Sequence, residues 1–283
     1  IEDATDRTYK LLAFESFESL KPIPRETFNS VDAEFFPGFV RKAVTLSYDD
    51  GPSSYDIKMI DMLNEKNIKA TFNLNSEKFS GIAQDKLLSY INAYNGHEVA
   101  NHTSNHVNFS EVSLDAAVNA INNGNDELKN IFGENAVKGF VYPYNRPYGE
   151  VNEEAIKNAI IASGAVYSRP STVSRSFDIP TDFHDWRFTC HHNQVEEFKN
   201  IFYDLKDNGR MYLFSIWGHS WEFNEDLTKN PPRSDTWETI LRPLINELQS
   251  KKDEIYNATN LEIYNYIKAK QQLVITVNMI YNP

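Results

Sequence analysis

The sequence predicts an α/β fold built on a parallel sheet that forms a barrel, either closed or incomplete. Short runs of β-branched and aromatic residues alternate with segments of helical periodicity along most of the 283 residues. Strands separated by helices are typical of βαβ units, whose strands run parallel. The chain length alone would also suit two smaller domains, so it is the number of these units that predicts a barrel.

The first expected strand covers residues 43–48, the run AVTLSY, which Gly51 and Pro52 bring to an end. The longest expected helix covers residues 114–132, where apolar side chains recur at helical spacing. The other expected strands are residues 69–74, 97–101, 139–144, 165–169, 211–217, 255–259 and 273–281. The other expected helices are residues 56–67, 84–93, 151–163, 195–206, 236–250 and 261–271. Residues 170–193 show no clear period, and irregular segments of this length in a compact domain are often functional.

Residues 1–38 are polar and are interrupted by three prolines. We expect them to form an N-terminal extension that packs against one domain, residues 39–283. The single cysteine, Cys190, excludes an internal disulfide framework and a cysteine-rich structural zinc site.

The net charge of −12 argues against nucleic acid as a partner and disfavours anionic membranes. The chain contains no apolar run of the roughly 18 residues that a membrane-spanning helix needs. It starts at Ile1 without a methionine, and no secretory signal is visible. We therefore expect a processed product that is secreted or periplasmic after removal of a signal peptide, with a cytoplasmic location as the alternative.

Asp49 and Asp50 stand side by side where the first strand gives way to Gly51 and Pro52. Successive side chains of a strand point to opposite faces, so both carboxylates can reach one pocket only at such a junction. A solvated turn is the alternative for this motif taken by itself. Partners elsewhere in the chain must decide between the two.

His102 and His106 are four residues apart. On a helical turn such residues share a face, with Cβ atoms roughly 5–6 Å apart, which lets two imidazoles bind one metal. One aspartate would complete three protein ligands, the number typical of catalytic sites that keep a position for water. Ordinary polar residues at a helix start are the alternative for an isolated pair, but the aspartates upstream favour the metal site. We expect His97 to be structural.

Together, the motifs SYDDGP and HTSNH resemble those of the NodB-homology polysaccharide deacetylases, carbohydrate esterase family 4. The resemblance extends in motif order over residues 43–267 and implies a distorted (β/α)7 barrel. It also implies that Asp49 is the general base and that Asp50, His102 and His106 hold one divalent metal ion. Mixed nitrogen and oxygen ligation suits zinc, cobalt, nickel, manganese or iron, and we expect zinc.

Family members add an arginine followed closely by Pro-Tyr, which holds the base, and a backbone N–H of that loop that helps to bind the oxyanion. The run GFVYPYNRPYGE leaves two registers open. Arg146 precedes Tyr148, whereas Tyr144 follows the strand more directly. Arg169 is the alternative source of the charge, and a surface or packing role is the alternative for either arginine.

The run FHDWRF resembles a later family element, in which Asp185 orients the acid histidine and Trp186 forms an apolar wall. A buried tryptophan beside a satisfied aspartate is the alternative. Three more histidines follow closely in this region, His184, His191 and His192. We expect no second metal cluster there, because adjacent histidines on an extended chain face opposite ways.

His219 follows the expected strand 211–217 after one glycine. By resemblance, it is the general acid that protonates the leaving group. Glu222 is a second candidate for orienting it. We expect Trp217 and Trp221 to stack on sugar rings, with core packing as the alternative.

The resemblance implies a metal-dependent enzyme that removes acetyl groups from an oligo- or polysaccharide, with N-acetylated amino sugars as the first choice. An esterase of O-acetylated, xylan-like chains is one alternative. A non-catalytic carbohydrate-binding protein on the same scaffold is another, and a structural module would bind no metal.

Overall fold

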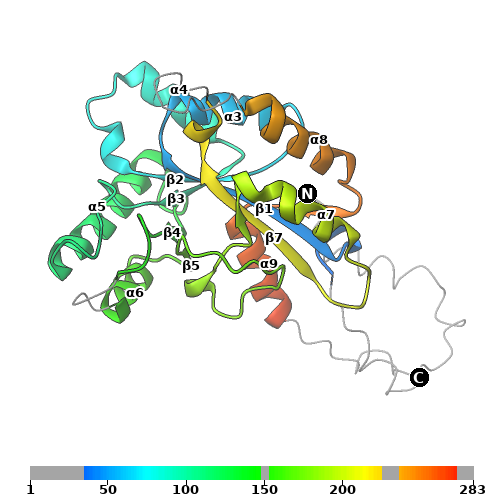
Figure 1. Cartoon of the computed structure of the whole chain (residues 1–283). Helices are drawn as coiled ribbons and strands as arrows, with labels where there is room; N and C mark the ends of the chain where they lie inside the picture. Colours follow the sequence, from blue (N-terminus) through cyan, green and yellow to red (C-terminus); the bar gives the residue numbers. More distant parts are fainter. Residues whose placement is uncertain (1–34, 148–152, 225–235, 273–283) are drawn as a thin grey trace, which may run out of the picture.

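The computed structural model describes residues 35–147, 153–224 and 236–272 (Figure 1). Its strands form one sheet in the order β5-β4-β3-β2-β1-β7-β6, with β8 also paired to β1, and every pairing is parallel. The strands are β1 (Lys42–Gly51), β2 (Thr71–Leu74), β3 (Glu98–Asn101), β4 (Gly139–Val141), β5 (Tyr167–Arg169), β6 (Cys190–His191), β7 (Tyr212–His219) and β8 (Ile255–Asn257).

Helices follow most strands, and α3 packs beside α8 and α5 beside α6 (Figure 1). The α-helices are α3 (Ser54–Asn64), α4 (Gln84–Tyr94), α5 (Leu114–Phe132), α6 (Glu153–Ala162), α7 (Val195–Asp204), α8 (Arg242–Ser250) and α9 (Asn260–Gln272). Short 3-10 turns are η1 (Pro37–Phe39), η2 (Ser76–Phe79), η3 (Phe183–Asp185), η4 (His192–Gln194) and η5 (Ser220–Phe223), and one π-helical turn, η6 (Trp237–Leu241), precedes α8.

The sheet is strongly curled. Strand β5 is four strands away from β1 in the strand order, which would be about 19 Å in a flat sheet. Arg169 at the end of β5 nevertheless contacts Asp49 on β1. Within the described ranges, no pairing joins β5 to β6 at the two ends of the order. The predicted α/β barrel is therefore confirmed, in its incomplete form.

The two faces of β1 differ in chemistry. Val44, Leu46 and Tyr48 pack in the largest hydrophobic cluster, which α3 and α8 cover. Thr45 alternates with them and donates to Asn260 Oδ1 at 2.5 Å on the other face. Asp49 shares this polar face, so the alternation of the strand aims its carboxylate into the concave side of the sheet.

Most predicted elements are confirmed within a few residues, and α5 has the predicted bounds. Strand β6 was not predicted, and it lies in the segment that shows no period. Residues 1–34 and the expected strand 273–281 lie outside the described residues, so the division between extension and domain stays a prediction. No helix among the described residues is both long and apolar enough to cross a bilayer.

Candidate active site

Asp49 is a buried carboxylate near the end of β1. Arg169 Nη2 donates to both of its oxygens, at 2.5 Å to Oδ2, and Asn73 Nδ2 donates to Oδ1 at 2.7 Å. Burial raises the pKa of Asp49, but the charges of Arg169 and the nearby histidines outweigh burial and hold the pKa below its ordinary value. Asp49 is therefore an ionised carboxylate that can accept a proton.

Asp50 breaks the alternation of the strand. Its φ of 68° lies in the left-handed region, which aspartate tolerates better than most residues, and the pairing with β2 shifts between Tyr48 and Gly51. Lys78 Nζ donates to the backbone oxygen of Asp50 at 2.5 Å. This backbone turn explains how two adjacent carboxylates serve one site, because in a regular strand they would face opposite sides of the sheet.

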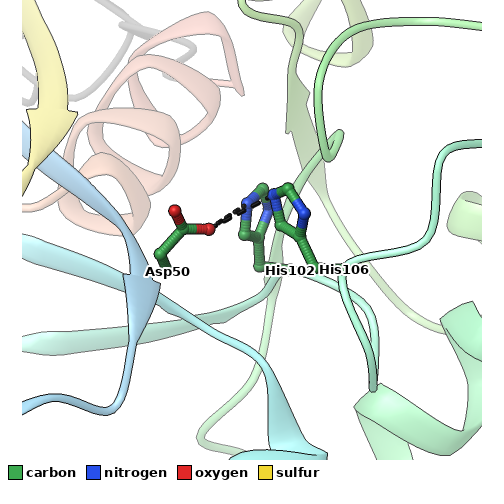
Figure 2. A group of neighbouring side chains, drawn as sticks. All are labelled: Asp50, His102 and His106. Carbon is green, nitrogen blue, oxygen red and sulfur yellow. Dashed lines mark ion pairs between the residues drawn. The ribbon is translucent and has the colours of Figure 1, made fainter.

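His102 and His106 lie on the loop after β3, so the prediction of a helical turn is wrong. The loop has positive φ at Thr103, 63°, and at His106, 55°, values that an α-helix excludes. This path still brings the two rings together, with centroids 4.9 Å apart. Figure 2 shows both rings turned toward the carboxylate of Asp50.

The three side chains fit one divalent metal ion. Nε2 of His102 and Nε2 of His106 lie 3.5 Å and 3.2 Å from Asp50 Oδ1. Ligands around a tetrahedral zinc ion lie about 3.3 Å from one another, given metal–ligand distances of about 2.0–2.1 Å. His102 Nδ1 lies 2.9 Å from the carbonyl oxygen of Val141, which places the ring proton on Nδ1 and leaves the Nε2 lone pair toward Asp50. This orientation is typical of a metal-binding histidine.

His219, at the end of β7, lies between two carboxylates. Its Nε2 is 3.6 Å from Asp50 Oδ2, and its Nδ1 is 3.0 Å from Glu222 Oε2. Burial lowers the pKa of His219, but the hydrogen bond to Glu222 and the charge of Asp49 outweigh burial and raise it above its ordinary value. The site therefore favours a protonated imidazole at this position.

Arg146, a candidate for holding the base, and Asp185, a candidate for orienting the acid, contact each other. Arg146 pairs with Asp185 and, at 2.9 Å, with Glu153. Asp185 also accepts a hydrogen bond from Arg187 Nε at 3.0 Å. The geometry thus favours Arg169 over Arg146 as the cation beside the base.

Three of the predicted aromatic residues lie around the site. Tyr144 is 61% exposed, and its ring centroid is 4.7 Å from that of His106. Trp221 Nε1 is 3.4 Å from Asp50 Oδ2, and the ring of Trp217 faces the guanidinium of Arg169 at 4.9 Å. These positions leave Tyr144 and the two tryptophans at the rim of the site.

The other two predicted aromatic residues are not at this rim. Trp186 is 1% exposed and packs against Tyr167, Phe183 and Phe188, which favours the packing role over the wall of a sugar site. Tyr148 lies outside the described residues, and nothing further is assigned to it.

One partner of Asp49 was not singled out from the sequence. Asn73 lies on β2 next to β1, and the only signal for it is a polar side chain inside a strand beside the aspartates.

His191 and His192 were expected to face opposite ways, but Nε2 of each lies within 3.4 Å of Glu222 Oε2. The expectation assumed an extended chain, whereas a 3-10 turn starts at His192.

Known proteins resemble this chain in part of its sequence and in its fold. Residues 38–162 match the sequence model of the family described as polysaccharide deacetylase. A peptidoglycan-N-acetylglucosamine deacetylase of Bacillus cereus is 38% identical over 127 residues, which cover 43% of this chain and 42% of that protein. A chitin deacetylase of Pestalotiopsis sp. is 33% identical over 79 residues, 28% of this chain and 26% of that protein. The alignments thus span less than half the length of these relatives.

A solved structure extends the similarity beyond the sequence match. A family 4 acetyl xylan esterase from Clostridium thermocellum, in complex with a cobalt ion, superposes with a TM-score of 0.50 at 16% identity. The superposition covers 85% of this chain and 97% of that one, so the likeness of fold includes the strands beyond residue 162. Residues 38–162 are thus similar in sequence to the polysaccharide deacetylases, and the described chain is similar in fold to a family 4 carbohydrate esterase.

Proposed function

We propose that this protein is a metal-dependent hydrolase that removes acetyl groups from N-acetylated amino sugars in an oligo- or polysaccharide. One observation carries the proposal: Asp49 and His219 flank the same cluster of Asp50, His102 and His106. Asp49 is a buried carboxylate paired with an arginine, and His219 is an imidazole that lies between two carboxylates. An ionised base, an acid and a metal-ligand set are the three parts that acetyl hydrolysis needs.

Asp50, His102 and His106 would hold the ion. A divalent ion in this position would supply Lewis acidity, which lowers the pKa of a water molecule to about 7 and polarises an acetyl carbonyl. Zinc is our first choice because two imidazoles and one carboxylate are ligands that it binds well. Cobalt, nickel, manganese and iron also bind such ligands.

Asp49 would take the proton of the attacking water. Its hydrogen bonds from Arg169 and Asn73 fix the carboxylate and occupy part of its lone pairs. These bonds also keep it ionised, since each of them stabilises the charged form. Arg169 acts through Asp49 and is a positioning residue.

His219 would give a proton to the departing amine. Glu222 accepts hydrogen bonds from both Nδ1 and the backbone N–H of His219, at 3.0 and 3.1 Å, which fixes the ring and directs Nε2 into the site. We therefore assign the orienting role to Glu222, the second of its two predicted candidates, and not to Asp185. Tyr144, Trp217 and Trp221 would contact the sugar and the acetyl group from the rim.

The test is acetate release from three substrates: chitin oligomers, peptidoglycan and acetylated xylan. The proposal predicts release from the N-acetylated substrates in proportion to bound metal, measured by elemental analysis of the same samples. Release from acetylated xylan alone would reassign the protein to O-acetyl esterases. No release from any of them by the metal-loaded protein would favour a carbohydrate-binding role.

A further inference from the structure

A second group of metal-ligating side chains lies beside the first. His191, His219 and Glu222 offer ligand atoms that all lie within 4.8 Å of one another, as do those of Asp50, His102 and His106. His191 Nε2 and His219 Nδ1 each lie 3.0 Å from Glu222 Oε2. Two imidazoles and one carboxylate at these spacings repeat the donor set of the first cluster.

The carboxylate oxygen at the centre of this group is crowded with nitrogen atoms. Besides the two imidazole nitrogens at 3.0 Å, the backbone nitrogen of His219 lies 3.1 Å away and His192 Nε2 lies 3.4 Å away. One carboxylate oxygen offers about two lone pairs, so it cannot accept a hydrogen bond from all four nitrogens. A cation placed among these atoms would be attracted by the carboxylate and by the imidazole lone pairs together.

A cavity connects His191 and Glu222 of this group to solvent. A cavity of about 560 Å³ is lined by His191, Glu222 and Trp217, together with Val173, Asn193 and Gln194. The side chains of His191 and Glu222 are 15% and 21% exposed. An ion can therefore reach Glu222 through this cavity.

We propose that His191, His219 and Glu222 form a second site for a divalent transition metal ion, and that its occupation inhibits the enzyme. The inhibitory part rests on the proposed function, because it depends on His219 being the general acid. Imidazole and carboxylate ligands suit zinc, cobalt, nickel or copper better than magnesium or calcium.

The chemistry of inhibition follows from the atoms involved. His219 Nδ1 donates to Glu222 Oε2 at 3.0 Å, and an ion that binds Nδ1 takes the electron pair that holds this proton, which passes to water. The remaining Nε2 proton then belongs to a neutral, metal-bound imidazole, which is a much weaker acid than imidazolium. A leaving amine is no longer protonated, so the step that general acid catalysis accelerates about 10²–10⁴-fold is lost.

Binding also has an identifiable cost. His191 Nδ1 accepts a hydrogen bond from the Asn193 backbone N–H at 3.3 Å. A metal on Nε2 of His191 places the ring proton on Nδ1 and breaks that bond. The bond is long, and its loss is one reason to expect weaker binding than at Asp50, His102 and His106.

The test is a count of bound ions on the full chain after removal of metal by chelation. Equilibrium dialysis against Zn²⁺, with elemental analysis, should show two ions per parent chain at saturation, one tight and one weaker. His191→Asn should bind one, since asparagine can still accept from the Asn193 N–H but loses the ligand nitrogen. His97→Asn, which changes a histidine outside both clusters, should bind two. Saturation of the parent at one ion, or two ions on His191→Asn, would overturn the second site.

Activity separates this inference from the proposed function. Excess Zn²⁺ should slow deacetylation of a chitin oligomer by the parent by about 10²–10⁴-fold, while His191→Asn resists. Hydrolysis of 4-nitrophenyl acetate should be spared, because its leaving group needs no proton. Equal inhibition of the parent and His191→Asn would overturn the inhibitory role. A parent chain that binds two ions but never releases acetate would refute the proposed function and leave the second site standing.

Discussion

Asp49 and His219 lie directly opposite each other in the parallel pairing of β1 with β7. Adjacent strands lie about 4.7–4.9 Å apart, so the pairing register alone brings the proposed base and acid to the same end of the sheet. Asp50 follows the base in sequence and is 3.6 Å from His219 Nε2. The fold thus holds the base, the acid and one metal ligand together through two neighbouring strands.

The proposed acid can be separated from the metal by the choice of leaving group. An amine must be protonated to leave, whereas 4-nitrophenolate departs unaided. His219→Ala should therefore slow deacetylation of an N-acetylglucosamine oligomer by about 10²–10⁴-fold and largely spare 4-nitrophenyl acetate, with metal content unchanged. Asp50→Ala should depress both activities together. Equal losses on the two substrates for His219→Ala, with metal retained, would place His219 in attack or oxyanion binding.

The metal-ligand assignment predicts which histidines the ion needs. His102→Ala and His106→Ala should each lose the tight ion, because a three-ligand site rarely survives the loss of one imidazole. His97 is the matched control in the same segment, since its ring accepts from the Ala70 backbone N–H at 3.2 Å and contacts Asn64. His97→Asn should keep the tight ion. Parent-like affinity in His102→Ala or His106→Ala, measured by dialysis and elemental analysis, would show that the ion binds elsewhere.

Arg169 and Arg146 allow a matched comparison. Arg169 is fully buried on Asp49, so Arg169→Gln should lower kcat through the raised pKa of the base and should destabilise the protein by about 3–5 kcal/mol. Arg169→Lys, which keeps the charge, should recover part of both losses. Arg146→Gln breaks a partly exposed pair and should cost about 0–1 kcal/mol.

Turnover and metal content of the three variants decide the matter. If Arg169→Lys and Arg169→Gln both fold and turn over as fast as the parent, the base is held by other groups. A selective loss of kcat in Arg146→Gln would return the role to Arg146.

These assignments show what the sequence could predict and what it could not. The strand ending in Asp49 and Asp50 was predictable because apolar alternation and the Gly-Pro break are local signals. The loop of His102 and His106 was not, since tertiary contacts fix its positive φ values and a four-residue spacing also suits a helix. The choice of Arg169 depends on the curl of the sheet, a property of the whole barrel. The gathering of His191 around Glu222 likewise depends on a turn that the sequence pattern does not mark.

A buried glutamate away from the site predicts how stability changes with pH. Glu98 accepts hydrogen bonds from Tyr167, Thr71 and the backbone N–H of Leu261, at 2.7, 2.8 and 2.8 Å. Burial outweighs these bonds and raises the pKa of Glu98 from 4.5 to about 7. The folded state therefore holds the proton more tightly than the unfolded state. The stabilisation is complete below about pH 4.5 and is lost as the pH rises through about 7.

Glu98→Gln should remove this dependence. Between pH 4.5 and pH 8, the free energy of unfolding of the parent should fall by up to about 3 kcal/mol relative to that of Glu98→Gln. Subtraction is needed because burial lowers the pKa of His97 to about 4, which acts in the opposite direction. Glu154→Gln on the exposed face of α6 is the control and should show no such shift. A difference that stays constant with pH, measured by urea unfolding, would mean that Glu98 keeps an ordinary pKa.

The central claim is that one ion at Asp50, His102 and His106 makes this protein a deacetylase. The most direct measurement is acetate release from a chitin oligomer by the full chain, first stripped of metal and then titrated with Zn²⁺ or Co²⁺. We expect no release from the stripped chain and a linear rise up to one ion per chain, with His102→Ala inactive throughout. Full acetate release by the stripped chain, or by His102→Ala, would contradict it.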